Sequence, residues 1–147
     1  MAKQQLLWED VEAGTELPTL PKVADSLMLV KWAGASGDFN PHHYEDTFAR
    51  TQGTDGTIVH GLLKHAWLIQ LVTGWMGDEG FLKKLSARCI LFNVFGDTQW
   101  VGGKIANKFQ EGDEYLVEIE ISTLNQRGEQ TMPGKALVSL PSKMRWV

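Results

Sequence analysis

The chain has 147 residues and a net charge of −4, and 43% of its residues are hydrophobic and 22% charged. This length favours one domain with one core, which we expect to span residues 1–147. The composition excludes dominant disorder, and the acidic balance argues against broad binding to nucleic acid or to an anionic membrane.

Cys89 is the sole cysteine, so no intrachain disulfide can form. It lies in the apolar run 89–92, and we expect a small buried hydrophobe rather than a nucleophile. The amino terminus lacks the apolar stretch of a signal peptide. The longest apolar-rich stretch, residues 62–72, is too short and too polar to span a bilayer. We therefore expect a cytoplasmic protein.

The first third of the chain predicts turns, one short strand and short helices. Ser26 is expected to cap a short helix over residues 27–33. That helix should end near Gly37, because Pro41 prevents an uninterrupted helix through the residues that follow. A second short helix is expected over residues 45–50.

A long helix is predicted over residues 60–74, which contain no proline and have glycine near both ends. Apolar residues cover most of its circumference, so we expect it to be buried on nearly all sides.

After Gly80 the pattern becomes extended, with turn signals between the segments. Strands are expected over residues 85–95, 100–109, 115–124 and 131–140. In the third, the odd-numbered residues from Tyr115 to Ile121 are apolar, whereas Glu118 and Glu120 face the other way, which indicates one buried and one wet face. A long buried helix followed by antiparallel strands predicts an α+β fold, with the sheet wrapped around the helix.

Asp38 and His43 lie five residues apart across a turn that contains Pro41, and such a turn can aim both side chains into one cavity. Histidine and carboxylate are suited to proton transfer near neutral pH. Adding water across an activated double bond needs two such groups, one at the water and one at the α-carbon. Each residue taken alone fits a structural role better, so the pattern predicts a proton-transfer site without naming a substrate.

His60 and Gly61 open the long helix. Backbone N–H groups at a helix start can stabilise a developing oxyanion. Gly61 has no side chain to keep a substrate carbonyl away from its N–H.

Residues 35–43 (ASGDFNPHH), followed by Ala49, closely resemble the signature of the MaoC-like, (R)-specific enoyl-CoA hydratases, also called hydratase 2. Residues 58–61 (IVHG) are similar to the second motif of that family, and weaker similarity covers most of the chain. The resemblance implies a hot-dog fold, with a curved antiparallel sheet around a central helix. It also implies a dimer that joins two such sheets.

The resemblance implies a hydro-lyase that reversibly adds water to a trans-2-enoyl thioester, of coenzyme A or of a carrier protein, and gives the (R)-3-hydroxyacyl thioester. By motif, Asp38 and His43 inherit the catalytic acid–base roles. Asn40 is implied to support the site, Gly61 to bind the thioester oxygen through its N–H, and His60 to lie beside the substrate. No cofactor is implied beyond the coenzyme A thioester itself.

The chain departs from the family pattern at several positions. His42 stands where the family usually has an aliphatic residue, and Ile69 where some members have serine. His65, one turn into the helix, is unusual. Both His65 and Ile69 are candidate pocket residues, although a partly exposed histidine is the simpler role for His65.

No metal site is expected, because His42 and His43 are adjacent and tend to diverge, and His60 and His65 fall on different helix faces. Two other functions stay open: a hot-dog thioesterase, and a silent partner subunit of a heteromeric dehydratase. A homodimer is expected, with a hetero-oligomer as the alternative. The sequence does not tell which acyl group is bound, whether coenzyme A or a carrier protein carries it, or in which direction the reaction runs.

Overall fold

The computed structural model describes residues 5–146 of the chain. Its strands are β1 (Leu20–Val23), β2 (Phe81–Ala87), β3 (Thr98–Glu111), β4 (Glu114–Asn125) and β5 (Gln130–Ser139). Its α-helices are α1 (Ser26–Ser36), α2 (Asp46–Thr51) and α3 (Gly61–Met76). Three short 3₁₀ helices are η1 (Trp8–Asp10), η2 (Pro41–His43) and η3 (Lys143–Trp146).

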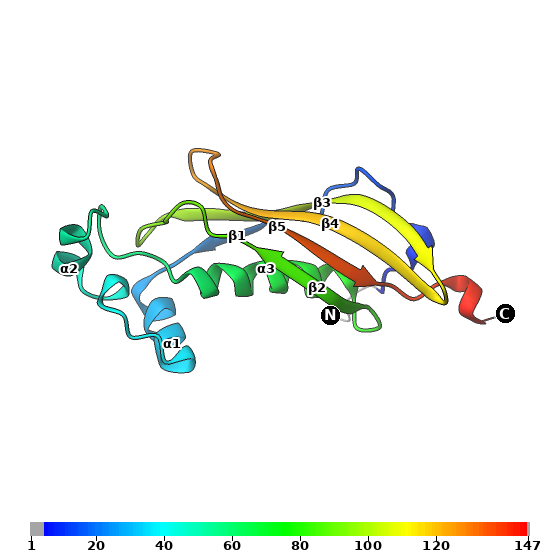
Figure 1. The fold of residues 1–147 in the computed structure, drawn as a ribbon, viewed down its shortest axis with the longest axis horizontal. Coiled ribbons are helices and arrows are strands. Elements are labelled where there is room, and N and C mark those ends of the chain that lie inside the picture. Colours follow the sequence, from blue (N-terminus) through cyan, green and yellow to red (C-terminus); the bar gives the residue numbers. More distant parts are fainter. Residues whose placement is uncertain (1–4, 147) are drawn as a thin grey trace.

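Within these residues, the five strands form one antiparallel sheet in the order β1-β3-β4-β5-β2. The sheet curls over α3, which lies along its inner face (Figure 1). Helices α1 and α2 lie together at one end of the molecule, beyond the start of α3. The architecture is the expected α+β hot-dog fold.

The inner face of the sheet and one face of α3 make the core. On β4, Val117, Ile119 and Ile121 are all at most 3% exposed, whereas Glu118 and Glu120 on the other face are exposed. The alternation expected for this strand is therefore present. The residues of α3 that pack against the sheet recur at helical spacing and are Leu63, Trp67, Leu68, Leu71 and Val72.

The opposite face of α3 departs from the expectation of burial on nearly all sides. Leu62 is 65% exposed and Ile69 is 36% exposed, and Gln70 beside them is exposed too. The sheet covers the helix on one side, so that a row of apolar side chains remains on the other.

The strand expected over residues 85–95 was wrong in its limits. Strand β2 starts at Phe81 and ends at Ala87, and the chain then continues along the sheet edge as a loop that carries exposed Ile90 and Phe92. Cys89 is exposed in this loop, so the prediction of a buried cysteine was wrong. Main-chain N–H groups within residues 88–91 still donate to β5, at Pro133 O and Thr131 O. Because β2 is the edge strand of the sheet, the apolar side chains of this stretch stay exposed, and an apolar run indicates a buried strand only where both of its faces are covered.

The start of α1 differs by one residue from the expectation. The capping residue is Asp25, whose Oδ1 accepts a hydrogen bond from Met28 N at 2.8 Å, and Ser26 is already helical. Aspartate and serine are both favoured caps, and the side chain that reaches the free N–H groups decides between them.

None of the helices formed by residues 5–146 combines the length and the apolar character needed to cross a membrane.

The core predicts a strong dependence of stability on Leu68, which is 0% exposed under the sheet. We expect Leu68→Ala to lower the free energy of unfolding by about 2–5 kcal/mol, because it leaves a cavity that the sheet cannot fill. Leu27, 59% exposed on α1, gives the matched control, and Leu27→Ala should change stability by less than about 0.5 kcal/mol. Urea unfolding measures both, and equal losses in the two variants would contradict this account of the core.

Candidate active site

The turn that carries the first motif is built by three local devices. Gly37 ends α1 in the left-handed conformation (φ 76°), which glycine adopts without strain. Asn40 then caps η2, and its Oδ1 accepts a hydrogen bond from His42 N at 3.1 Å. Pro41 occupies the first position of η2, where its missing N–H costs nothing. Asn40 therefore supports the turn that presents His43.

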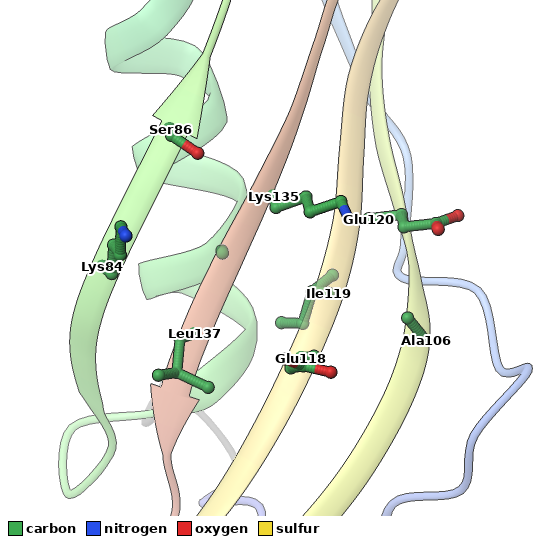
Figure 2. A pocket seen from close by; sticks show the side chains of 9 residues that line it. Lys84, Ser86, Ala106, Glu118, Ile119, Glu120, Lys135 and Leu137 are labelled. Atoms are coloured by element: carbon green, nitrogen blue, oxygen red, sulfur yellow. The ribbon is translucent and has the colours of Figure 1, made fainter.

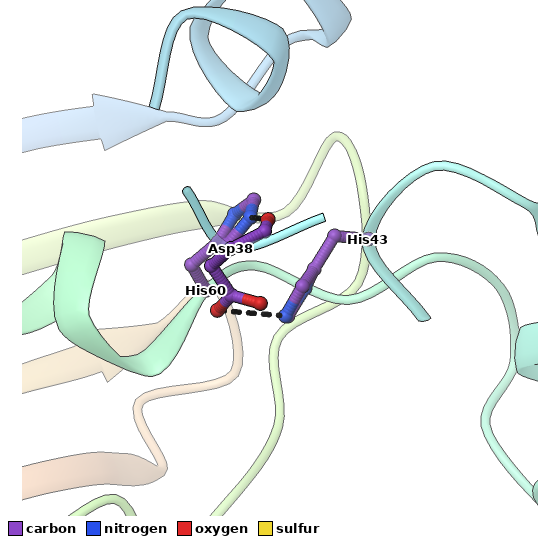
Figure 3. A group of neighbouring side chains, drawn as sticks. All are labelled: Asp38, His43 and His60. Carbon is purple, nitrogen blue, oxygen red and sulfur yellow. Dashed lines mark hydrogen bonds and ion pairs between the residues drawn. The ribbon is translucent and has the colours of Figure 1, made fainter. Parts of the chain in front are cut away.

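His43 has one nitrogen fixed by the backbone. Its Nδ1 lies 2.7 Å from Ile58 O, and a carbonyl oxygen only accepts, so Nδ1 carries the proton. The other nitrogen, Nε2, faces Asp38 Oδ2 at 3.7 Å (Figure 3). The side chain of His43 is 11% exposed and that of Asp38 is 41% exposed. The carboxylate thus lies toward solvent and the imidazole toward the protein.

His60 lies directly against His43. The two rings stack with centroids 3.7 Å apart and an angle of 20° between their planes. His60 is 1% exposed, and its Nε2 donates to the main-chain oxygen of Asp38 at 3.2 Å. Burial, and then the proximity of His43, lower the pKa of His60 below its ordinary value of 6.5. His60 is therefore a neutral ring at pH 7, and its buried Nδ1 has no hydrogen-bond partner among the described residues.

Gly61 is the first residue of α3, and no side chain caps this end of the helix. The first N–H groups of a helix have no acceptor within the helix and carry its positive dipole end. A Cβ built on Gly61 would meet no atom within 4 Å. The space beside this residue is open to an approaching carbonyl group.

Lys64 is the feature of this region that sequence reasoning missed. It is 0% exposed, and its Nζ donates to Leu91 O at 3.0 Å and to Asn93 Oδ1 at 2.9 Å. Burial lowers the pKa of its amine. Asn93 in turn accepts at its main-chain oxygen from Val59 N at 2.8 Å. Lys64 thereby ties the loop after β2 to the segment that leads into His60. Its place four residues after His60, on the buried face of α3, was the available signal.

A cleft of about 410 Å³ opens beside the two stacked histidines. His43 and His60 form part of its wall, and most of the remaining wall is apolar. The predicted pocket residues His65 and Ile69 are not among the described residues that line it.

A second hollow, of about 330 Å³, lies on the face of the sheet away from α3 (Figure 2). Its wall includes Glu118, Glu120, Lys84 and Lys135, and Glu120 and Lys135 are direct cross-strand neighbours. Opposite charges paired across strands are typical of a solvated sheet face. None of the described residues that line this hollow is a histidine, so the histidine cleft is the candidate active site.

His42, the unusual residue of the motif, has a structural environment. Its ring meets Phe48 edge-on, with centroids 5.0 Å apart, and its Nδ1 lies 2.9 Å from Asn40 Oδ1. His42 therefore packs within the turn and does not join the group of Asp38, His43 and His60.

Donor atoms of Asp38, His43 and His60 all lie within 4.8 Å of one another, a grouping that could in principle hold a metal ion. The sequence argument considered only the pairs His42/His43 and His60/His65, so it did not predict that His43 and His60 lie together. The stacked rings keep their in-plane lone pairs in two nearly parallel planes, and one nitrogen of each ring already faces a carbonyl oxygen. A metal ion needs converging lone pairs, so the arrangement favours proton transfer.

Comparisons with known proteins point to one family. Residues 9–102 match the family described as "MaoC like domain". An (R)-hydratase from A. caviae involved in PHA biosynthesis is 25% identical, with a TM-score of 0.82 over 90% of this chain and 99% of that one. The R-hydratase PhaJ1 from Pseudomonas aeruginosa has the same fold, with 23% identity and a TM-score of 0.84 over 95% of this chain and 88% of that one.

The ChsH1-ChsH2 complex from Mycobacterium tuberculosis contains a chain with this fold, at 23% identity and a TM-score of 0.78 over 88% of this chain and 98% of that one. Fatty acid synthase subunit beta from Gibberella zeae is 34% identical over 87 residues, which are 59% of this chain. The chain covers only 4% of that much longer protein.

Acid is expected to destabilise the fold through His60. Because the pKa of His60 is lowered on folding, the unfolded chain binds its proton at a higher pH than the folded chain does. The free energy of unfolding should therefore fall as the pH drops below the ordinary value of 6.5, until the lowered pKa is reached. Urea unfolding between about pH 7 and pH 5 should show a shallower loss in His60→Gln. His65→Gln is the control that keeps the parent slope, and an unchanged slope in His60→Gln would contradict the assignment.

The purified protein is expected to hold far less than one equivalent of zinc or iron, because the two imidazoles do not converge. Elemental analysis after purification without chelators measures this. One equivalent that disappears in both Asp38→Asn and His60→Gln would establish a metal site in place of a proton-transfer site.

Proposed function

Because the chain belongs to the MaoC-like domain family, we propose that it reversibly hydrates a trans-2-enoyl thioester to the (R)-3-hydroxyacyl thioester. The observation that carries the proposal is the Asp38 carboxylate facing His43 Nε2 at 3.7 Å, close to the start of α3. The similarity to the (R)-hydratase from A. caviae supports the product configuration. The similarity to fatty acid synthase subunit beta supports an acyl substrate.

Asp38 and His43 divide the proton transfers. With Nδ1–H donated to Ile58, Nε2 of His43 is a proton acceptor, and the ionised carboxylate of Asp38 is another. Their separation of 3.7 Å is too long for a direct hydrogen bond, and we place the attacking water beside the pair, where it donates to both. This water attacks the β-carbon as one group takes its proton, and the pair delivers one proton to the α-carbon. One proton enters the pair and one leaves, so the pair returns to its starting state.

Gly61 supplies the electrostatic half of the reaction. As the β-carbon is attacked, negative charge develops on the thioester oxygen, and an N–H at the positive end of α3 stabilises it. Loss of a single oxyanion donor typically costs about 10²–10³ in rate, so this contribution is comparable to that of the acid–base pair. Proton transfer and an oxyanion donor suffice for the chemistry, and we propose no cofactor beyond the thioester substrate.

We include a homodimer in the proposal. Leu62 on α3 and Ile90 and Phe92 in the loop after β2 are each at least 50% exposed, and exposed apolar groups of this kind mark association surfaces. A hetero-oligomer is the alternative, since a chain of the ChsH1-ChsH2 complex has the same fold.

The proposal predicts that the enoyl absorbance of crotonyl-CoA falls when the protein is added. Asp38→Asn and His43→Ala should each lower kcat/KM by about 10²–10⁴, the usual contribution of general acid–base catalysis. Asp113→Asn, in the exposed turn between β3 and β4, is the matched control and should keep the parent rate.

Variants of Asp38 and His43 that match the parent rate would refute the site. A free thiol released while the enoyl absorbance stays constant would identify a thioesterase. An inactive parent that becomes active with a second chain would identify a partner subunit.

A further inference from the structure

We propose that the cleft beside His43 and His60 receives the acyl chain of the thioester, and that Ala33 on α1 limits the length of that chain. The proposal rests on the hydratase function above and names its substrate class: aliphatic enoyl thioesters of medium chain length.

The wall of this cleft is apolar and is supplied mainly by α1 and by aromatic side chains. Leu29 and Ala33, four residues apart on α1, are 4% and 6% exposed and form its inner wall. Its outer wall is made of side chains that are at least half exposed, namely Val30, Phe39, Tyr44 and Phe95. An aliphatic chain that enters between these layers leaves water on nearly all sides.

Within the part of the chain that the structure describes, the cleft lacks the positive charges that would bind the phosphates at the other end of the substrate. No lysine or arginine is among the described residues that line it. Its one carboxylate, Asp46, is already paired with Arg50, at 2.7 Å from Nε. The phosphates of coenzyme A or of a carrier-protein arm need cationic or N–H donors, so this part of the substrate lies outside the cleft.

The position of the catalytic groups gives the direction of the chain. A thioester oxygen at the Gly61 N–H places the β-carbon near His43 and Asp38, because Gly61 directly follows His60 and the two histidines stack. The carbons beyond the β-carbon then continue past His43 into the space that His43 and His60 border.

The size of the cleft sets the length of the chain. If each non-hydrogen atom takes about 30 Å³, the share of one water molecule in the liquid, then 410 Å³ holds roughly a dozen such atoms. A crotonyl group fills a small part of this space, and an acyl group of medium length fills it. A larger side chain at position 33 would shorten the space from its inner end.

The test compares trans-2-enoyl-CoA substrates with crotonyl, octenoyl and dodecenoyl groups. In the parent protein, kcat/KM should rise from crotonyl to octenoyl by on the order of threefold to fourfold per added methylene, the value expected for transfer of a methylene out of water. Ala33→Phe should lower the ratio of dodecenoyl to crotonyl kcat/KM at least tenfold, since four lost methylene contacts alone exceed that factor.

Two further variants keep the test decisive. Val30→Trp also narrows the cleft, and because Val30 is 63% exposed this variant does not disturb the core. It decides the question if Ala33→Phe fails to fold. Ala35→Trp, on the same helix but outside the cleft wall, is the matched control and should leave all three activities unchanged.

The outcomes separate this proposal from the hydratase function. Turnover with a chain-length profile that neither cleft variant changes would overturn the acyl assignment and leave the hydratase function intact. An equal loss for crotonyl and dodecenoyl substrates would also overturn it, since the cleft would then bind the part common to both. No turnover of any enoyl-CoA by the parent would overturn both.

Discussion

The buried amine of Lys64 is the interaction on which the geometry of the candidate site depends. A lysine with 0% exposure loses its hydration, and two carbonyl oxygens replace the lost water contacts. One of them belongs to Asn93, whose backbone holds Val59, and the preceding residue, Ile58, holds the ring of His43. A short series of hydrogen bonds therefore connects the interior of α3 to the imidazole that faces Asp38. If Lys64 moved, the orientation of His43 would lose its support.

The stacked histidines give the site an electrostatic asymmetry. His60 is buried and kept neutral, and it lies flat against His43, which is adjacent to the Asp38 carboxylate. Two stacked imidazolium rings would repel each other, and the lowered pKa of His60 keeps that ring neutral beside His43. The buried ring thus gives the face of His43 opposite to solvent an uncharged neighbour.

The sequence predicted well what depends on short spacings and poorly what depends on distant partners. The turn between Asp38 and His43 followed from Pro41, and β4 followed from its alternation. The limits of β2 did not, because the apolar run after Ala87 looks like a buried strand and is exposed. The spacing of Lys64 from His60 on α3 indicated only its place on the buried face; its partner Asn93 lies 29 residues later, and that contact exists only in the folded chain. The cleft wall from α1 was missed for the same reason, since α1 and the histidines meet only in the folded chain.

The loop after β2 combines exposed apolar side chains with a hydrogen-bonded backbone. Its side chains Ile90 and Phe92 are exposed. The amine of Lys64 holds its backbone at Leu91 O and the side chain of Asn93 at Oδ1, and Val59 N holds the main-chain oxygen of Asn93. A surface of this kind surrenders little conformational entropy on association, because its backbone is ordered before any partner arrives. Because little conformational entropy is lost, most of the free energy of the apolar contacts made by this loop contributes to affinity, so even a small interface there can be tight. Preorganisation of a recognition surface is thus a second effect of the same buried charge.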